Sequence, residues 1–192
     1  MKTTVDFKSD DDEELWQQVA NYFNSNEGLL SFNAVLQLRA YAVNVNIDID
    51  LGGGFESGYE TTTLTTNIKQ QDFKFSLHRE NFIDEIGKFF GMEDVEIGYP
   101  EFDKKLVVKT NDRERLQTLF ANQTTRQFIE QLHNFTFGIV HHSIEHSIEK
   151  QTQLELIIET AIKDVATLRS VFNSFYDVLV KLDASKSSSP LY

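Results

Sequence analysis

The chain has 192 residues, which is enough for one or two domains and for a sizeable apolar core. Its 30 acidic and 18 basic residues give a formal net charge of −12, which disfavours binding to nucleic-acid phosphates and to anionic membrane surfaces. The sequence contains no cysteine, so disulfides, thiolate metal sites and cysteine nucleophiles are excluded.

The clearest patterns in the first 51 residues are one helix and one strand. An acidic run at residues 9–14 leads into apolar residues spaced three to four apart, which predicts a helix over residues 11–23. Between residues 43 and 51, apolar and polar residues alternate with the period of two that is typical of a strand with one solvated face. The polar members of this strand are Asn44, Asn46, Asp48 and Asp50.

After this strand, turn and strand signals predict a hairpin. The glycine-rich residues 52–58 interrupt the first strand, and the threonine-rich residues 59–68 predict its return strand. Residues 73–77 predict a third, shorter strand. The apolar spacing over residues 79–90 predicts a second helix, which Gly91 would end.

The patterns in the middle of the chain predict two short strands and a short helix. Residues 95–98 predict a short strand that Pro100 ends, and residues 106–109 predict another strand. Asn111 and Asp112 follow this strand and can accept hydrogen bonds from the free N–H groups of a helix. A short helix is therefore expected directly after them.

The last third of the chain predicts a short helix, three strands and a long helix. The short helix starts at Thr124, and alternation predicts a strand over residues 135–142 with partners at 144–150 and 154–158. Residues 162–183 carry a continuous apolar seam, which predicts the longest helix of the protein.

Together these patterns predict an α+β fold with an antiparallel sheet, either one large sheet or two smaller ones. The helices, including the long C-terminal one, are expected to pack on one face of the sheet. Residues 1–184 are assigned to a single domain, with two similar halves over about 11–98 and 99–184 as the alternative. The serine-rich residues 185–192 are expected to form a flexible tail.

The motif HSIEH at residues 142–146 has the H-x-x-E-H order of inverted zinc proteases. That chemistry needs a helix, which would bring His142 and His146 to one face. Here the strand pattern continues into the motif and places Glu145 on the face opposite both histidines. A solvated histidine-rich strand is therefore favoured, with weak metal binding by His141, His142 and His146 as the alternative.

Residues 102–112 read FDKKLVVKTND, a strand that ends in a basic residue and a helix-capping pair. Together with the elements around it, over residues 99–182, this segment resembles a family of uncharacterised bacterial proteins with a loose F-D-x-x-apolar-V-apolar-K-x-N-D motif. No activity is assigned to these proteins, so the resemblance transfers no functional residue.

The sequence favours a non-catalytic binding or protein-interaction module, acting as a monomer or a homodimer and without a cofactor. The polar residues Asn44, Asn46, Asp48 and Asp50 are the predicted partner-binding set, and their carboxylates favour a basic or polar partner. The alternatives are a metal-dependent hydrolase using His141, His142, His146 and Glu145, or a carrier of a small apolar ligand held between the sheet and the last helix. No signal peptide or long apolar segment is recognised, so a cytoplasmic location is expected.

Overall fold

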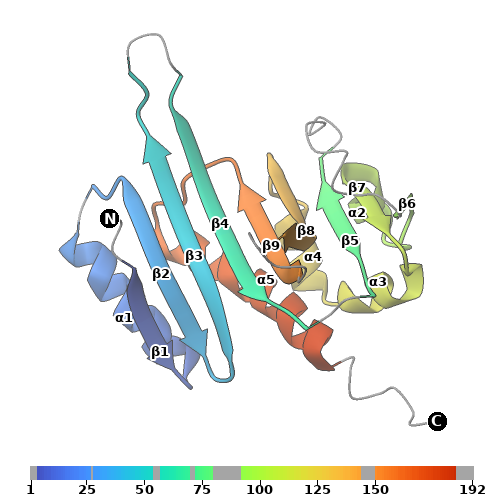
Figure 1. Ribbon diagram of the computed structural model, residues 1–192, viewed down its shortest axis with the longest axis horizontal. Helices are drawn as coiled ribbons and strands as arrows, with labels where there is room; N and C mark the ends of the chain where they lie inside the picture. Colours follow the sequence, from blue (N-terminus) through green and yellow to red (C-terminus); the bar gives the residue numbers. More distant parts are fainter. Residues whose placement is uncertain are drawn as a thin grey trace.

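The computed structural model describes residues 4–26, 28–53, 57–69, 72–79, 92–143 and 150–184. Within these ranges it contains one nine-stranded sheet and five helices, so the predicted α+β class is confirmed. Strands from both halves of the chain belong to this one sheet (Figure 1). The assignment of residues 1–184 to a single domain stays a prediction.

The sheet has the strand order β1-β2-β3-β4-β9-β8-β5-β7-β6. Its strands are β1 (Val5–Ser9), β2 (Ser31–Leu38), β3 (Tyr41–Asp50), β4 (Tyr59–Asn67), β5 (Phe75–His78), β6 (Glu93–Asp94), β7 (Val107–Thr110), β8 (Phe135–Ser143) and β9 (Lys150–Ile158). β1 and β2 pair in parallel, and every other pair of neighbours is antiparallel. The pairing of β4 with β9 joins residues about 90 positions apart in the sequence, such as Leu64 and Leu156.

The helices are α1 (Asp12–Ser25), α2 (Pro100–Lys105), α3 (Arg113–Leu119), α4 (Gln123–Ile129) and α5 (Val165–Ala184). In Figure 1, α1 and α5 lie behind the sheet, and no labelled helix lies in front of β2, β3 and β4. One face of this part of the sheet is therefore covered by helices, and the opposite face has no helix among the described residues. None of the described helices is both long enough and apolar enough to cross a membrane.

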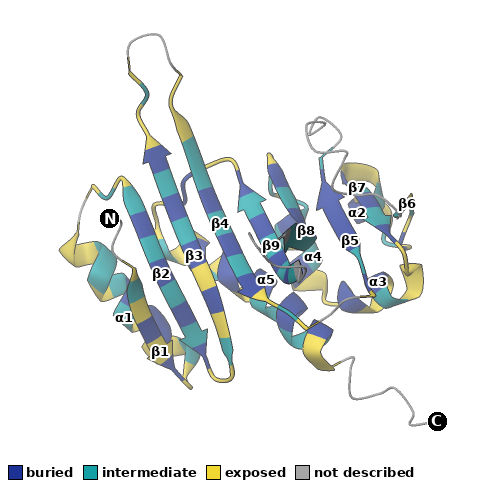
Figure 2. Ribbon diagram, viewed as in Figure 1, coloured by how far each residue is buried: buried dark blue, intermediate teal, exposed yellow. Residues whose placement is uncertain are grey.

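Burial alternates along the strands as their pleat requires (Figure 2). In β2, Phe32, Ala34, Leu36 and Leu38 are buried, and the residues between them are half-buried. The same alternation in β3 buries its valines and isoleucines and leaves the asparagines and aspartates exposed or half-buried. The two faces of the central strands thus differ in chemistry.

Phenylalanine dominates the core on the helix side. Phe75 of β5 and Phe137 of β8 contact each other edge to face, with ring centroids 5.7 Å apart. Phe175 of α5 stacks on Phe137 at 5.7 Å, and all three rings are at most 1% exposed. Each such ring removes a large apolar area from water, so these contacts fix α5 on the sheet.

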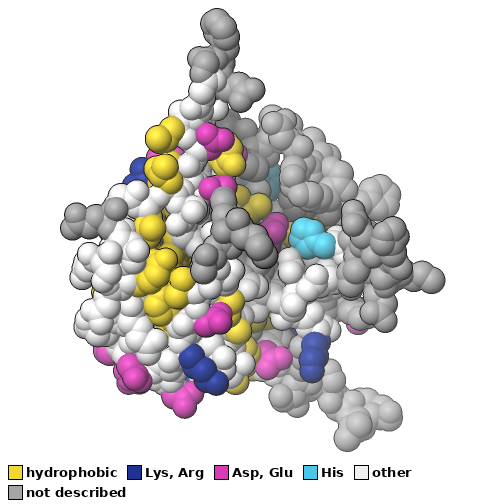
Figure 3. Space-filling view, turned by 60° about the vertical axis from the view of Figure 1, so that its left-hand side comes forward, with side chains coloured by type: hydrophobic (Ala, Val, Ile, Leu, Met, Phe, Trp, Pro, Cys, Tyr) yellow, Lys and Arg dark blue, Asp and Glu magenta, His cyan; other side chains and the backbone are white. Residues whose placement is uncertain are grey.

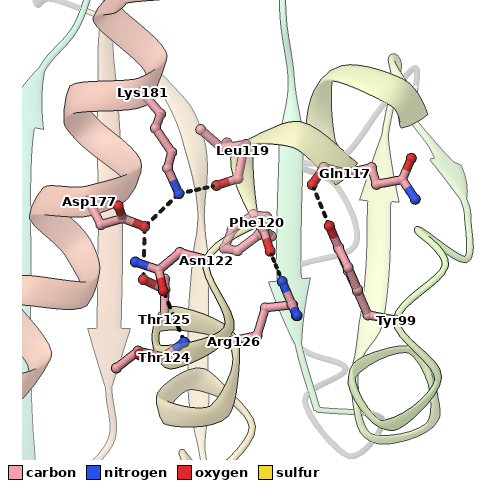
Figure 4. Close-up of polar contacts among 10 residues, drawn as sticks. All are labelled: Tyr99, Gln117, Leu119, Phe120, Asn122, Thr124, Thr125, Arg126, Asp177 and Lys181. Atoms are coloured by element: carbon pink, nitrogen blue, oxygen red, sulfur yellow. Dashed lines mark hydrogen bonds and ion pairs between the residues drawn. The ribbon is translucent and has the colours of Figure 1, made fainter.

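Polar contacts complete the packing of the short helices against α5 (Figure 4). The carboxylate of Asp177 accepts hydrogen bonds from the Thr125 hydroxyl of α4 and from Lys181 Nζ, each at 2.8 Å. Lys181 also donates to the last carbonyl of α3 at 3.2 Å. The guanidinium of Arg126 lies 3.6 Å from the centroid of the Tyr99 ring, a cation–π contact. These bonds tie three helices together at their ends.

Several predicted elements are confirmed with shifted ends, and two predictions are corrected. The predicted strand at residues 95–98 is wrong, because the Asp103 side chain accepts hydrogen bonds from the N–H groups of residues 97, 98 and 99 at 2.9–3.0 Å and holds them in a loop. Pro100 does not end a strand but begins α2, where a proline needs no N–H partner. Asp112 caps α3 as expected, whereas Asn111 bonds to the backbone of Lys74 and Asp72.

Three strands were not predicted, and three predictions concern residues that the structure does not describe. β1, β2 and the two-residue β6 are additions to the predicted sheet. The parallel pairing of β1 with β2 means that the sheet is mixed rather than purely antiparallel. Nearly all of the helix expected at residues 79–90, most of the strand expected at 144–150 and the tail at 185–192 lie outside the described residues.

Candidate functional site

The helix-free face of the sheet is lined by polar side chains, and we call it the polar sheet face. Residues in register on neighbouring strands share a face, and the row through Asn46 joins Asn33 of β2 to Thr63 of β4. Further rows continue across β9 and β8. The polar sheet face is made of Asn33, Val35, Gln37, Asn44, Asn46, Asp48, Asp50, Thr61, Thr63, Thr65, Asn67, Gln151, Gln153, Glu155, Ile157, Thr136, Gly138, Val140 and His142.

The formal charges at the centre of this face are negative. On the five strands β2, β3, β4, β9 and β8, Asp48, Asp50 and Glu155 bring three carboxylates, His142 brings one imidazole, and no lysine or arginine lies on this face. In register, Lys8 of β1 and Lys109 of β7 follow at its two edges. Amides and hydroxyls make up most of the remainder. Figure 3 shows part of the surface from a turned view, in which acidic side chains and a few basic ones lie scattered among hydrophobic and white atoms. The face therefore combines a negative potential with many hydrogen-bonding groups.

The amides of the face are ordered by bonds to one another. Asn46 donates to the side-chain oxygen of Asn33, its neighbour in register. The side-chain oxygen of Asn67 accepts from Gln151 at 2.7 Å and from Gln153 at 2.9 Å. Because a carboxamide has two donors and two acceptor positions, one or two such bonds leave further capacity for a ligand.

The carboxylates of β3 are held in a similar way. The Tyr59 hydroxyl lies 3.4 Å from Asp48 Oδ2, and Tyr59 itself is 52% exposed. Asp50 Oδ1 accepts the N–H of Gly52 at 2.8 Å, which fixes this carboxylate at the end of the strand. The four residues predicted to bind a partner are therefore neighbours on one face, and their role in binding stays a prediction.

His142 and Glu155 form the one imidazole–carboxylate pair that the described residues place on this face. His142 Nε2 lies 3.7 Å from Glu155 Oε2, which is too long for a hydrogen bond but close enough for an ion pair when the imidazole is protonated. The Glu155 side chain is only 14% exposed, and in register it lies between Thr65 and Gly138. Hydrolysis would also need a positioned nucleophile or metal beside this pair.

The structure places two of the three histidines of the predicted metal site, His141 and His142, on opposite faces of β8, and metal binding by the full set stays a prediction. His141 Nδ1 lies 3.0 Å from Thr152 Oγ1, which belongs to the buried side of β9, whereas His142 lies on the polar sheet face. Successive residues of a strand point to opposite faces, so these two imidazoles diverge. His146 and Glu145 lie outside the described residues. Among the described residues there is no group of three His, Asp or Glu side chains suited to a metal ion.

The acidic run at the start of α1 has a structural role. Asp11 caps the helix by accepting the N–H of Glu14 at 2.9 Å. Arg169 of α5 donates to both Asp12 and Glu13, and this hydrogen bond lowers the pKa of the Glu13 carboxyl below its usual range. The same contacts raise the pKa of Arg169. These charges join α1 to α5.

Part of the polar sheet face was not predicted from the sequence. Asn33 and Gln37 come from β2, where the alternation of buried and half-buried residues is as regular as in β3 and could have been recognised. Glu155 and the glutamines of β9 come next to β3 and β4 only through long-range strand pairing. No family model, curated protein or solved structure matches this chain.

Proposed function

We propose that this protein is a non-catalytic binding module whose polar sheet face binds a basic, polar surface of a partner protein. The observation that supports this proposal is the composition of the five central strands of the face, with three carboxylates, many amides and hydroxyls, and lysines only on the edge strands β1 and β7. A partner with the opposite charge is attracted over a distance of about one Debye length, roughly 8 Å at physiological salt. The net charge of −12 acts in the same direction.

The dimensions of the face suit a protein partner. Five adjacent strands contribute to it, and at a spacing of about 4.8 Å they span about 24 Å. Eight residues of a strand extend about 26 Å at roughly 3.3 Å per residue. The resulting area, on the order of 600 Å², approaches the roughly 800 Å² per partner that is typical of a specific interface.

The amide groups would determine how the partner is oriented in such an interface. Asn33, Asn46, Asn67 and Gln153 are already oriented by the bonds between them, so little side-chain entropy is lost when a partner arrives. Their remaining donors and acceptors can bind backbone or side-chain groups of the partner. The carboxylates then provide attraction and discriminate against acidic surfaces.

Affinity capture with the full-length protein tests this proposal. The tagged wild type is incubated with a lysate of its native cells at about 0.15 M salt and at about 0.5 M salt, where the Debye length falls to roughly 4 Å. We expect at least one basic protein to be captured at the lower salt concentration and lost at the higher one. The double variant Asp48→Lys with Asp50→Lys should lose this protein already at the lower concentration.

A matched control separates the effect of the charge on this face from the effect of the protein's net charge on binding. Glu101→Lys with Glu114→Lys makes the same change in total charge on exposed positions of α2 and α3. This control should capture the partner as the wild type does. If the Asp48 and Asp50 variant retains every salt-sensitive protein, the polar sheet face is only a solvated surface and the proposal is wrong.

A further inference from the structure

An apolar pocket of about 400 Å³ lies where α1 ends and α5 begins. Phe32 of β2 and Ile47 and Ile49 of β3 line it from the buried face of the sheet, opposite the polar sheet face. Phe23 near the end of α1 and Val165 at the start of α5 line it from the helices. The pocket is thus built from three separate parts of the chain.

The pocket exists because the two helices end before they cover the sheet. α1 and α5 are held together near the start of α1, where the ring centroids of Trp16 and Phe172 lie 5.5 Å apart and Arg169 binds Asp12 and Glu13. From this contact α1 runs on to Ser25, and α5 extends back to its first residue at position 165. Beyond these two ends, loop residues rather than a helix surround the buried side chains of β2 and β3.

The charged groups at the rim already have partners within the chain. Lys163 Nζ lies 2.8 Å from Glu60 Oε1, and the Asp164 carboxylate accepts the N–H of Thr167 at 2.7 Å. Asn26 donates to the carbonyl of Tyr22 at 2.9 Å. An anionic ligand would therefore leave water and find the lysine of the rim already paired with Glu60, which is unfavourable.

The apolar lining has aromatic character. The rings of Phe23 and Phe32 meet edge to face with their centroids 4.9 Å apart. Two isoleucines of β3 and Ile162 add branched aliphatic surface next to them. Such walls favour apolar ligands, because burial of apolar surface is worth roughly 25 cal/mol per Å².

We propose that this pocket binds a small, uncharged and mainly apolar molecule. Its volume lies near the lower end of the range of about 300–1,000 Å³ that is typical of small-molecule sites. The pocket and the polar sheet face lie on opposite sides of the sheet, so this proposal does not depend on the proposed partner binding.

The neutral fluorescent probe N-phenyl-1-naphthylamine tests the pocket, since its emission rises in apolar surroundings. We expect saturable binding to the wild type with one site per chain. Val165→Trp, which fills the pocket from α5, should weaken binding at least tenfold. Val180→Trp is the matched control, because it is also half-buried on α5 but lies about 22 Å along the helix at 1.5 Å per residue, and it should bind within twofold of the wild type.

An NMR titration of the wild type tests the pocket without relying on variants that must first fold. Isoleucine methyl groups are labelled, and their NMR signals are followed as the probe is added. We expect the signals of Ile47, Ile49 and Ile162 to shift and those of Ile129 and Ile139 to stay in place. Absence of saturable binding, equal weakening by both tryptophan variants, or shifts only at Ile129 and Ile139 would each overturn the proposal.

Discussion

Gly138 of β8 occupies a position that has no room for a side chain. A Cβ atom built there would lie 2.4 Å from the carbonyl oxygen of Phe75 and 3.1 Å from Cα of Ser76, both in the backbone of β5. Real Cβ atoms essentially never come within 3.0 Å of such an atom, so the two strands would have to separate by at least 3.0 − 2.4 = 0.6 Å. Gly138→Ala is therefore expected to strain the pairing of β8 with β5.

Overpacking of this kind typically costs about 1–3 kcal/mol in the free energy of unfolding. For a chain of this length, each kcal/mol corresponds to a shift of roughly 2–4 °C in Tm, so we expect Tm to fall by about 4–8 °C for a central cost of about 2 kcal/mol. Thermal unfolding followed by far-ultraviolet circular dichroism measures this shift.

Gly53→Ala is the matched control, because a Cβ atom at Gly53 meets nothing within 4 Å. This variant should change the free energy of unfolding by less than about 0.5 kcal/mol, as ordinary surface substitutions do. If Gly138→Ala melts within about 1 °C of both the control and the wild type, far less than the scaling of free energy to Tm requires, β8 and β5 do not approach each other this closely.

The remaining predictions concern the core, a buried hydrogen bond and one ion pair. Phe175→Ala removes a fully buried ring and should lower the free energy of unfolding by about 3–5 kcal/mol in urea denaturation. Thr125→Val keeps the shape of a 3% exposed side chain but removes the hydrogen bond to Asp177, and should cost roughly 1–3 kcal/mol in the same assay. Glu13→Gln should lower stability at pH 7. Because Arg169 lowers the pKa of Glu13 in the folded state, this loss should shrink as the pH falls below about 4.

Each of these predictions has a control at an exposed residue. Asn173→Ala and Thr124→Val change exposed residues of α5 and α4 and should have little effect. Glu101→Gln neutralises an exposed carboxylate of α2, and its effect should not depend on pH in the same way. A Glu13→Gln effect that grows below pH 4 would contradict the sign of the pKa shift.

Elements with a strong local period could be predicted from the sequence. The helix from Asp12 and the seam of α5 are long enough for a period of 3.6 to be unambiguous, and β3 alternates over ten residues. β2 carries the same kind of alternation, although Val35 stands on its polar side and weakens the contrast. β1 has only five residues, and its parallel partner lies beyond a whole helix, so no local signal defines it.

The orientation of the candidate site was predictable, but its extent was not. The alternation in β3 was enough to place Asn46 and Asp48 on the polar side. Their proximity to Glu155 depends on the pairing of β4 with β9, which joins segments about 90 residues apart in the sequence. The contact of His142 with Glu155 likewise depends on the register of β8 and β9, which alternation alone does not determine.

Site-specific photo-crosslinking tests the central claim, that the polar sheet face binds the partner, most directly. A photoreactive phenylalanine analogue is placed at Thr63, in the middle of this face, or at Thr118, an exposed residue of α3. After irradiation of the captured complex, the account predicts a covalent adduct with the salt-sensitive partner from position 63 and none from position 118. Adducts from position 118 alone, or equally from both positions, would contradict it.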